Sequence, residues 1–165
     1  MSDSVSYSRF GAGIAVLALV FVLFAPSVEA AVATPHPGTQ IIKTDLSFAA
    51  LRKNLEAAVQ ANKMYVVTRA SARRGAAGRG ITILGNLVIG VYRNDFAVRM
   101  LRASIPSGIE APLRFYVTEN SDGTATLTYR EPSAIFAPYD SAELTTMAKE
   151  LDAIWRRIAA QATGR

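Results

Sequence analysis

The sequence contains no cysteine and only one histidine, His36. The absence of cysteine excludes a disulfide framework, a thiol nucleophile, thiolate metal ligands and a lipidated N-terminal cysteine. A single histidine cannot form a histidine-cluster zinc site, and His36 stands between two prolines in a stretch expected to be solvated, so a serine nucleophile has no imidazole base. We therefore expect no catalytic residues, no bound metal and no cofactor.

Carboxylates are the acid–base groups that remain, but their spacing selects no catalytic pair. Structural roles account for several of them, because Asp122 lies in an expected turn while Asp45 and Asp140 precede expected helices. A phosphate-binding loop is also missing. The glycines of residues 73–80 (RRGAAGRG) lead into an expected strand, whereas the glycines of a nucleotide-binding loop open a helix.

One long apolar run is present, at the N-terminus, where residues 11–25 (GAGIAVLALVFVLFA) contain no polar side chain. A membrane-spanning helix needs about 20 apolar residues, so this shorter run is typical of a signal peptide. Val28 and Ala30 then occupy the positions at which signal peptidase selects small residues. We expect a signal peptide over 1–30, cleaved after Ala30, and a periplasmic or secreted protein. The alternative is an uncleaved N-terminal membrane anchor.

The net charge is +5, which makes the chain moderately basic. Such a charge favours anionic envelope surfaces such as phospholipid headgroups, and it also simply keeps a small domain soluble. An exported protein meets neither chromosomal DNA nor cytosolic nucleotides. We therefore expect an anionic surface or a small anionic ligand as a partner, and no nucleic acid.

A single globular domain is expected, because 165 residues with 50% hydrophobic and 19% charged residues suit one core. Residues 31–40 (AVATPHPGTQ) show no apolar periodicity and predict an extended linker, which leaves residues 41–165 for the domain. After a short extended segment, the first helix is predicted to be capped by Asp45 or Ser47 and to end at Asn62.

The remaining elements follow from apolar periodicity and turn signals. First come a strand over 64–70, a flexible basic connection over 71–80, and strand segments over 81–92 with a turn or bulge at Gly85-Asn86. A short helix over 96–104 and two strands joined at 120–123 (NSDG) follow. The chain then continues as a loop over 132–143 and ends in a final helix. That helix carries an apolar stripe of Leu144, Met147, Ala148, Leu151, Ile154, Trp155, Ile158 and Ala159. The order predicts an α+β fold, in which two main helices cover one face of a mostly antiparallel sheet.

Residues 108–139 (GIEAPLRFYVTENSDGTATLTYREPSAIFAPY) resemble the most recognisable block of DUF302 domains. In that family an Ile-acid-Leu-Pro step leads into a strand, followed by an acidic-Asp-Gly hairpin and a tyrosine before Asp-Pro or Glu-Pro. The resemblance extends over residues 41–139 and more loosely over the final helix. It implies a TATA-binding-protein-like fold of order β-α-β-β-short α-β-β-α, with a homodimer as one expected state, and no established activity. No catalytic residue is carried over.

The chain also departs from the family pattern. Asn94 falls at the family's asparagine, but Arg93 and Asp95 replace its glycine and proline. Where the family has an Asp-His pair, this chain has Arg69 and Ala70. These departures suggest an exported branch of proteobacterial type with RNDFAVRML as its local signature.

Arg93, Asn94 and Arg99 are the candidate ligand-binding residues. Arginines close to a strand end and a helix N-terminus offer paired donors to a carboxylate or a phosphate. Asp95 is predicted to cap the helix and to pair with Arg99 one turn later. The alternative is that these arginines bond only internally, to Asp95, to Glu110 or to nearby carbonyls.

Three functional hypotheses remain open. The first is a non-enzymatic envelope module that binds a small anionic or amphipathic ligand at Arg93, Asn94 and Arg99. The second is a homodimeric structural or interaction protein without a small-molecule ligand, in which Tyr92–Leu101 is interface or core. The third is a carboxylate-based hydrolase.

Overall fold

The computed structural model describes residues 36–165. The expected signal peptide (1–30) and its cleavage site lie outside the described residues, as do residues 31–35 of the expected linker. Within the described part, no helix combines the length and the apolar character needed to cross a membrane.

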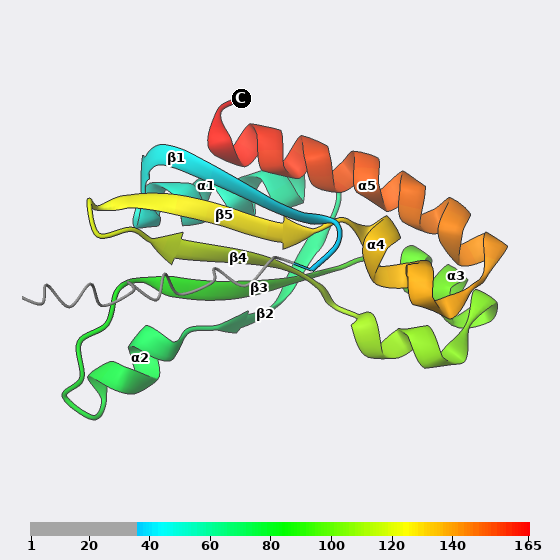
Figure 1. Cartoon of the computed structure of the whole chain (residues 1–165), viewed down its shortest axis with the longest axis horizontal. Helices are drawn as coiled ribbons and strands as arrows, with labels where there is room; N and C mark the ends of the chain where they lie inside the picture. Colours follow the sequence, from blue (N-terminus) through cyan, green and yellow to red (C-terminus); the bar gives the residue numbers. More distant parts are fainter. Residues whose placement is uncertain (1–35) are drawn as a thin grey trace, which may run out of the picture. The chain divides into compact units, whose positions relative to one another are not determined.

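Five strands form one antiparallel sheet in the order β1-β5-β4-β3-β2 (Figure 1). The strands are β1 (Thr39–Ser47), β2 (Tyr65–Ala70), β3 (Asn86–Tyr92), β4 (Leu113–Glu119) and β5 (Thr124–Arg130). Strands β1 and β2 form the two edges, and β4 lies in the centre. The sheet is therefore wholly antiparallel.

Two long helices, α1 (Phe48–Ala61) and α5 (Ala142–Thr163), pack against each other and against one face of this sheet. The alternation of strand residues turns apolar side chains such as Ile89 and Phe115 toward them. Every member of the apolar stripe predicted for the last helix is buried. Phe115 stacks on Trp155 with the ring centroids 5.5 Å apart, so the centre of the core lies between β4 and α5. The predicted fold class is confirmed.

The helix caps differ in part from the prediction. Ser47, not Asp45, caps α1, because its hydroxyl accepts a hydrogen bond from the Ala50 amide at 3.3 Å. In the same way Ser141, not Asp140, caps α5. Asn62 ends α1 as predicted. The Ser47 alternative is therefore confirmed for α1, whereas the prediction of Asp140 for α5 is wrong. At both helices the serine stands directly before the first helical residue, and the aspartate stands too early to reach the first free amides.

Several segments predicted to be irregular are helical. The basic connection contains α2 (Ala72–Ala77), and the predicted loop over 132–143 contains α4 (Pro132–Phe136) and the 3-10 helix η2 (Ala137–Tyr139). A further 3-10 helix, η1 (Ile105–Glu110), follows α3 (Asn94–Ala103). Proline suits the first helical position, which explains why Pro132 starts a helix where a loop was predicted.

Two strand boundaries also differ. Strand β1 begins at Thr39, so the end of the expected linker belongs to the sheet. Strand β3 begins only at Asn86, because the Gly85 amide bonds the Glu119 carboxylate at 2.6 Å and residues 81–85 stay outside the sheet. The hairpin at 120–123 is confirmed, with Gly123 at φ +83 and Asp122 accepting hydrogen bonds from Thr124.

Candidate functional site

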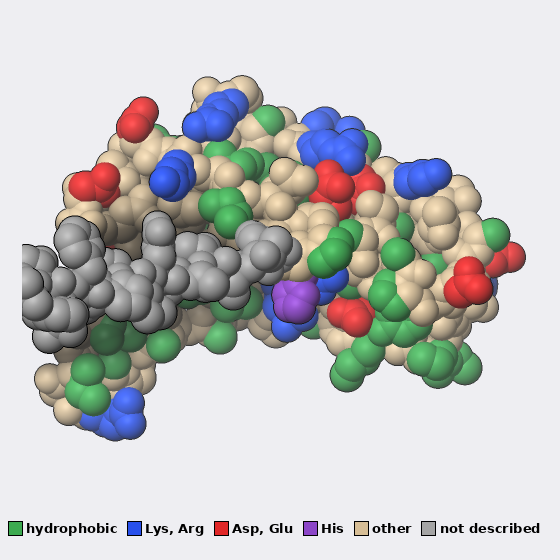
Figure 2. All heavy atoms as spheres, in the orientation of Figure 1, with side chains coloured by type: hydrophobic (Ala, Val, Ile, Leu, Met, Phe, Trp, Pro, Cys, Tyr) green, Lys and Arg blue, Asp and Glu red, His purple; other side chains and the backbone are tan. Residues whose placement is uncertain are grey.

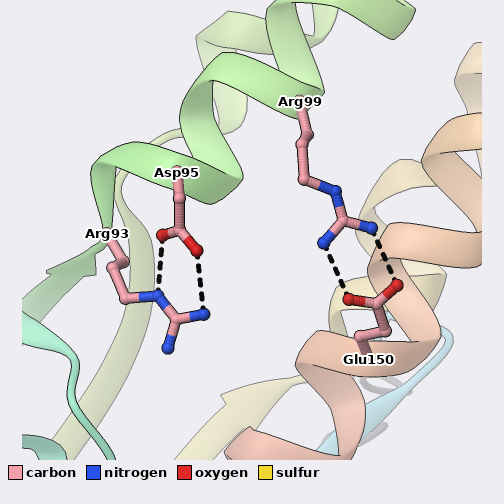
Figure 3. Close-up of polar contacts among 4 residues, drawn as sticks. All are labelled: Arg93, Asp95, Arg99 and Glu150. Atoms are coloured by element: carbon pink, nitrogen blue, oxygen red, sulfur yellow. Dashed lines mark hydrogen bonds and ion pairs between the residues drawn. The ribbon is translucent and has the colours of Figure 1, made fainter.

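Arg93 links the end of β3 to the start of α3, and its guanidinium holds the carboxylate of Asp95. The two groups form two parallel hydrogen bonds, of 2.7 and 3.0 Å (Figure 3). These bonds, more than any other influence, lower the pKa of Asp95 below that of an ordinary aspartate. The positive charge of Arg93 is therefore neutralised within the protein.

The prediction that Asp95 caps α3 is wrong in its geometry. The capping position is occupied by Arg93, and no side chain bonds the free amides there as a cap. Asp95 lies in the first turn, where a negative charge is favourable beside the positive end of the helix dipole. Its contribution to α3 is therefore electrostatic.

The predicted pairing of Asp95 with Arg99 is also wrong. Arg99 reaches from α3 to α5 and forms two hydrogen bonds of 2.7 Å with Glu150 (Figure 3). These hydrogen bonds raise the pKa of Arg99 and lower that of Glu150. Glu110, the other expected partner, instead accepts a hydrogen bond from the Tyr139 hydroxyl.

Arg93 and Asn94 stand at the start of α3, and Arg99 lies further along the same helix. Arg93 and Arg99 each hold a carboxylate, and Asn94 is exposed at the first helical position. Both arginines form internal ion pairs, as the alternative prediction stated. Glu150, however, was not among the predicted partners.

An apolar pocket adjoins Arg93 on the helix-covered side of the sheet. It is lined by Met64, Val91, Tyr92, Arg93, Phe96, Ala97, Met100, Ala111, Leu113, Phe136, Met147, Leu151 and Trp155. Its free volume is small, about 30 Å³. Arg93 forms part of its rim, and the guanidinium carbon lies 4.3 Å from the centroid of the Phe96 ring, within the range of a cation–π contact.

Trp155 is the residue of this pocket that sequence reasoning missed as a functional candidate. It is only 1% exposed, and its indole N–H has no hydrogen-bond partner among residues 36–165. Buried polar groups are nearly always hydrogen-bonded, so this donor of a pocket-lining residue needs an explanation. No sequence signal could have found it, because Trp155 fits the apolar stripe of α5 like any core residue.

A family model described as "Domain of unknown function DUF302" matches residues 40–162. The chain belongs to the DUF302 family. A crystal structure of an uncharacterized conserved DUF302 protein from Bacillus stearothermophilus has the same fold, with a TM-score of 0.66 at 16% sequence identity. The similarity covers 78% of this chain and 97% of the other one. No curated protein matches the sequence.

The carboxylates of this DUF302 domain bind internal partners, and Glu131 and Asp152 both approach the guanidinium of Arg156. Glu119 binds Arg73 and the Gly85 amide, while Glu131 binds Arg156. Asp152, which sequence analysis did not single out, is 6% exposed and accepts a hydrogen bond from the Ser133 amide at 2.9 Å. These contacts are structural. Within the described part of the chain, no cluster of three or more acidic or histidine side chains is arranged to hold a metal ion.

Proposed function

We propose that this DUF302 domain is a non-enzymatic binding module for a small, mainly apolar ligand that carries one hydrogen-bond acceptor. The ligand would enter the pocket beside Arg93. The observation that supports this proposal is a mainly apolar pocket whose lining includes Trp155, the indole N–H of which has no hydrogen-bond partner among residues 36–165.

The lining favours an apolar ligand that is larger than the void itself. Met64, Met100 and Met147 all line the pocket. Methionine is unbranched and polarizable, so it adapts its conformation to a neighbouring group at low cost. Three such side chains allow the pocket to widen around a short aliphatic chain.

The indole N–H of Trp155 is the reason why the ligand should carry a hydrogen-bond acceptor. Leaving a buried polar group without a hydrogen bond costs about 1–3 kcal/mol. A ketone, ester or hydroxyl oxygen bound at Trp155 would recover this free energy, which a pure hydrocarbon would not. We therefore expect ligands with an oxygen acceptor to bind more tightly than hydrocarbons of the same length.

The rim favours a neutral ligand over an anionic one, which modifies the hypothesis drawn from the sequence. Arg93 already donates two hydrogen bonds to Asp95. An anionic headgroup would have to displace the Asp95 carboxylate to gain the same contacts. A neutral headgroup would bind without displacing the Asp95 carboxylate.

We further propose that the domain acts in the cell envelope, as an exported branch of the family marked by RNDFAVRML. The support is the apolar run of residues 11–25, followed by Val28 and Ala30. Purification from the envelope of cells that express the full sequence, with the mass of the mature chain, tests this part. A chain that retains residues 1–30 in the membrane would replace it with the anchored alternative.

Trp155 is the only tryptophan, so a ¹⁵N-labelled sample gives a single indole N–H signal that reports on the pocket. Titration with 2-pentanone should shift this signal downfield and saturate, whereas n-pentane should shift it less. Ala97→Phe fills the pocket and should abolish the response. Val98→Phe, on the exposed side of the same helix, is the matched control.

The proposal fails if the indole signal of the folded protein responds to neither probe, or if Ala97→Phe and Val98→Phe behave alike. Light scattering on the same samples gives the oligomeric state. A stable dimer that binds no probe would support the homodimeric interaction protein instead.

A further inference from the structure

The face of the sheet opposite α1 and α5 carries two arginines side by side. The register pairs Phe115 of β4 with Tyr129 of β5, and both of these side chains are buried under the helices. Continuing the same register by one residue places Arg114 opposite Arg130, and strand alternation turns both to the open face. Directly opposed residues of antiparallel strands have Cβ atoms only about 4.5–5.5 Å apart.

Among residues 36–165, no carboxylate forms a salt bridge with either of these two arginines. Five other arginines of the described chain form salt bridges: Arg69, Arg73, Arg93, Arg99 and Arg156. Neither Arg114 nor Arg130 forms a salt bridge or a side-chain hydrogen bond with another residue of 36–165. The Nε of Arg130 is buried and has no hydrogen-bond partner there.

The acidic residues closest in sequence to the two arginines, Glu110 and Glu131, are already engaged. Glu131, next to Arg130, binds Arg156 of α5, and Glu110, at the end of η1, accepts a hydrogen bond from Tyr139. Like charges placed directly opposite each other destabilise a sheet. Within the part of the chain that the structure describes, the pair is therefore unfavourable by itself, and an anion between the two guanidinium groups would make it favourable.

The surroundings indicate what else the ligand carries. Two residues along the same strands from the arginines, Tyr116 and Thr128 form the next pair on the open face. Ile41 of β1 pairs with Thr128, and the exposed fractions are 40% for Tyr116 and 54% for Ile41. An apolar and aromatic surface thus lies beside the positive charges. Figure 2 shows that hydrophobic (green) and basic (blue) side chains both occur on the visible face of the molecule.

We propose that Arg114 and Arg130 form a binding site for a phosphate group attached to an apolar or aromatic body. Two guanidinium groups match the charge of a phosphomonoester, about −1.5 to −2 at neutral pH, and guanidinium binds phosphate oxygens through paired hydrogen bonds. Tyr116 would contact the attached body. This site is separate from the pocket beside Arg93, because its arginines point to the opposite face of the sheet.

The test is calorimetric titration of the full chain with phenyl phosphate and, separately, with inorganic phosphate. We expect saturable binding, tighter for phenyl phosphate because of Tyr116. Arg114→Gln and Arg130→Gln should each weaken binding by at least about tenfold, the scale of one lost charge-assisted hydrogen-bond pair. Arg79→Gln removes the same charge from the exposed segment after α2 and should change affinity less than about twofold.

Vesicles distinguish the two sources of such a phosphate. Binding to phosphatidic acid vesicles, but not to phosphatidylcholine vesicles, with the same dependence on Arg114 and Arg130, identifies a lipid headgroup. Binding of phenyl phosphate without binding to vesicles identifies a soluble ligand. The absence of saturable binding to all probes overturns the proposal, and so does an equal loss of binding in Arg79→Gln.

We do not expect the arginine variants to unfold, so weaker binding can be attributed to the lost side chain. Removing one of two opposed like charges should leave the melting temperature of Arg114→Gln unchanged or higher. A clearly lower melting temperature would show that the two arginines serve the fold, and the proposal would be rejected.

Discussion

The guanidinium of Arg99 on α3 holds both carboxylate oxygens of Glu150 on α5 at 2.7 Å. The two residues are 51 positions apart in the sequence, and both side chains are nearly half exposed. The ion pair joins the short helix beside the pocket to the long helix that carries Trp155. Its strength therefore bears on how firmly α3 is held at the pocket.

The first prediction concerns acid stability. The folded-state pKa of Glu150 lies below its ordinary value, so this group stabilises the fold above the pKa of an unfolded glutamate, about 4.3. The stabilisation is lost as the pH falls from there through the lower folded-state pKa. Urea unfolding of wild type and Glu150→Gln, compared at pH 7 and pH 3, should show a smaller difference between the two proteins at pH 3. A constant difference at both pH values would contradict the proposed role of this ion pair.

The second prediction separates true caps from a charge in the first turn. Ser47→Ala and Ser141→Ala each remove a hydrogen bond to a helix amide, which typically costs about 1 kcal/mol. Asp95→Ala should cost less, about 0.5 kcal/mol or below, because it removes only an exposed ion pair and a dipole contact. Chemical denaturation of the three variants gives this order directly. An equal or larger loss for Asp95→Ala would restore the cap interpretation.

The third prediction tests how Asp95 governs the pocket rim. Asp95→Asn leaves Arg93 without its carboxylate partner, so the arginine becomes available to an anionic ligand. The affinity for pentanoate, relative to that for 2-pentanone, should rise roughly fivefold, the scale of one partly exposed ion pair. The indole signal of Trp155 measures both affinities. Asn94→Ala, at the adjacent exposed position, should leave the ratio unchanged.

The fourth prediction concerns the buried carboxylate of Asp152. It accepts a hydrogen bond from the Ser133 amide and so fixes the start of α4 against α5. Asp152→Ala leaves that amide without a partner and should cost about 1–3 kcal/mol of unfolding free energy. Asp152→Asn keeps an acceptor oxygen and should cost less. Equal losses in the two variants would mean that the negative charge, and not the hydrogen bond, is the important feature.

The long elements could be predicted from the sequence because their apolar periodicity reflects burial. The stripe from Leu144 to Ala159 is one example, and the hairpin signal at residues 120–123 is another. The helix α3 could be predicted in the same way, but α2 and α4 could not, because contacts with distant residues hold them. The first amide of α2, that of Ala72, bonds the Asn86 side chain, and the start of α4 depends on Asp152.

The same limit applies to the candidate site. The attraction between Arg93 and Asp95 is local, and the sequence offered it as one alternative. The partner of Arg99 could not be predicted, because Glu150 reaches it only through the packing of α5 against α3. The free indole N–H of Trp155 and the pairing of Arg114 with Arg130 depend on which neighbours surround them, and periodicity does not specify that.

Strand β1 lies at an edge of the sheet, and β5 is its neighbour there. The residues at the beginning of the domain therefore cannot join the sheet until residues 124–130 have been synthesised and have formed their hairpin. Contacts between such distant segments slow folding, since a long loop must close before they form. A chain built in this way stays incompletely folded during most of its synthesis.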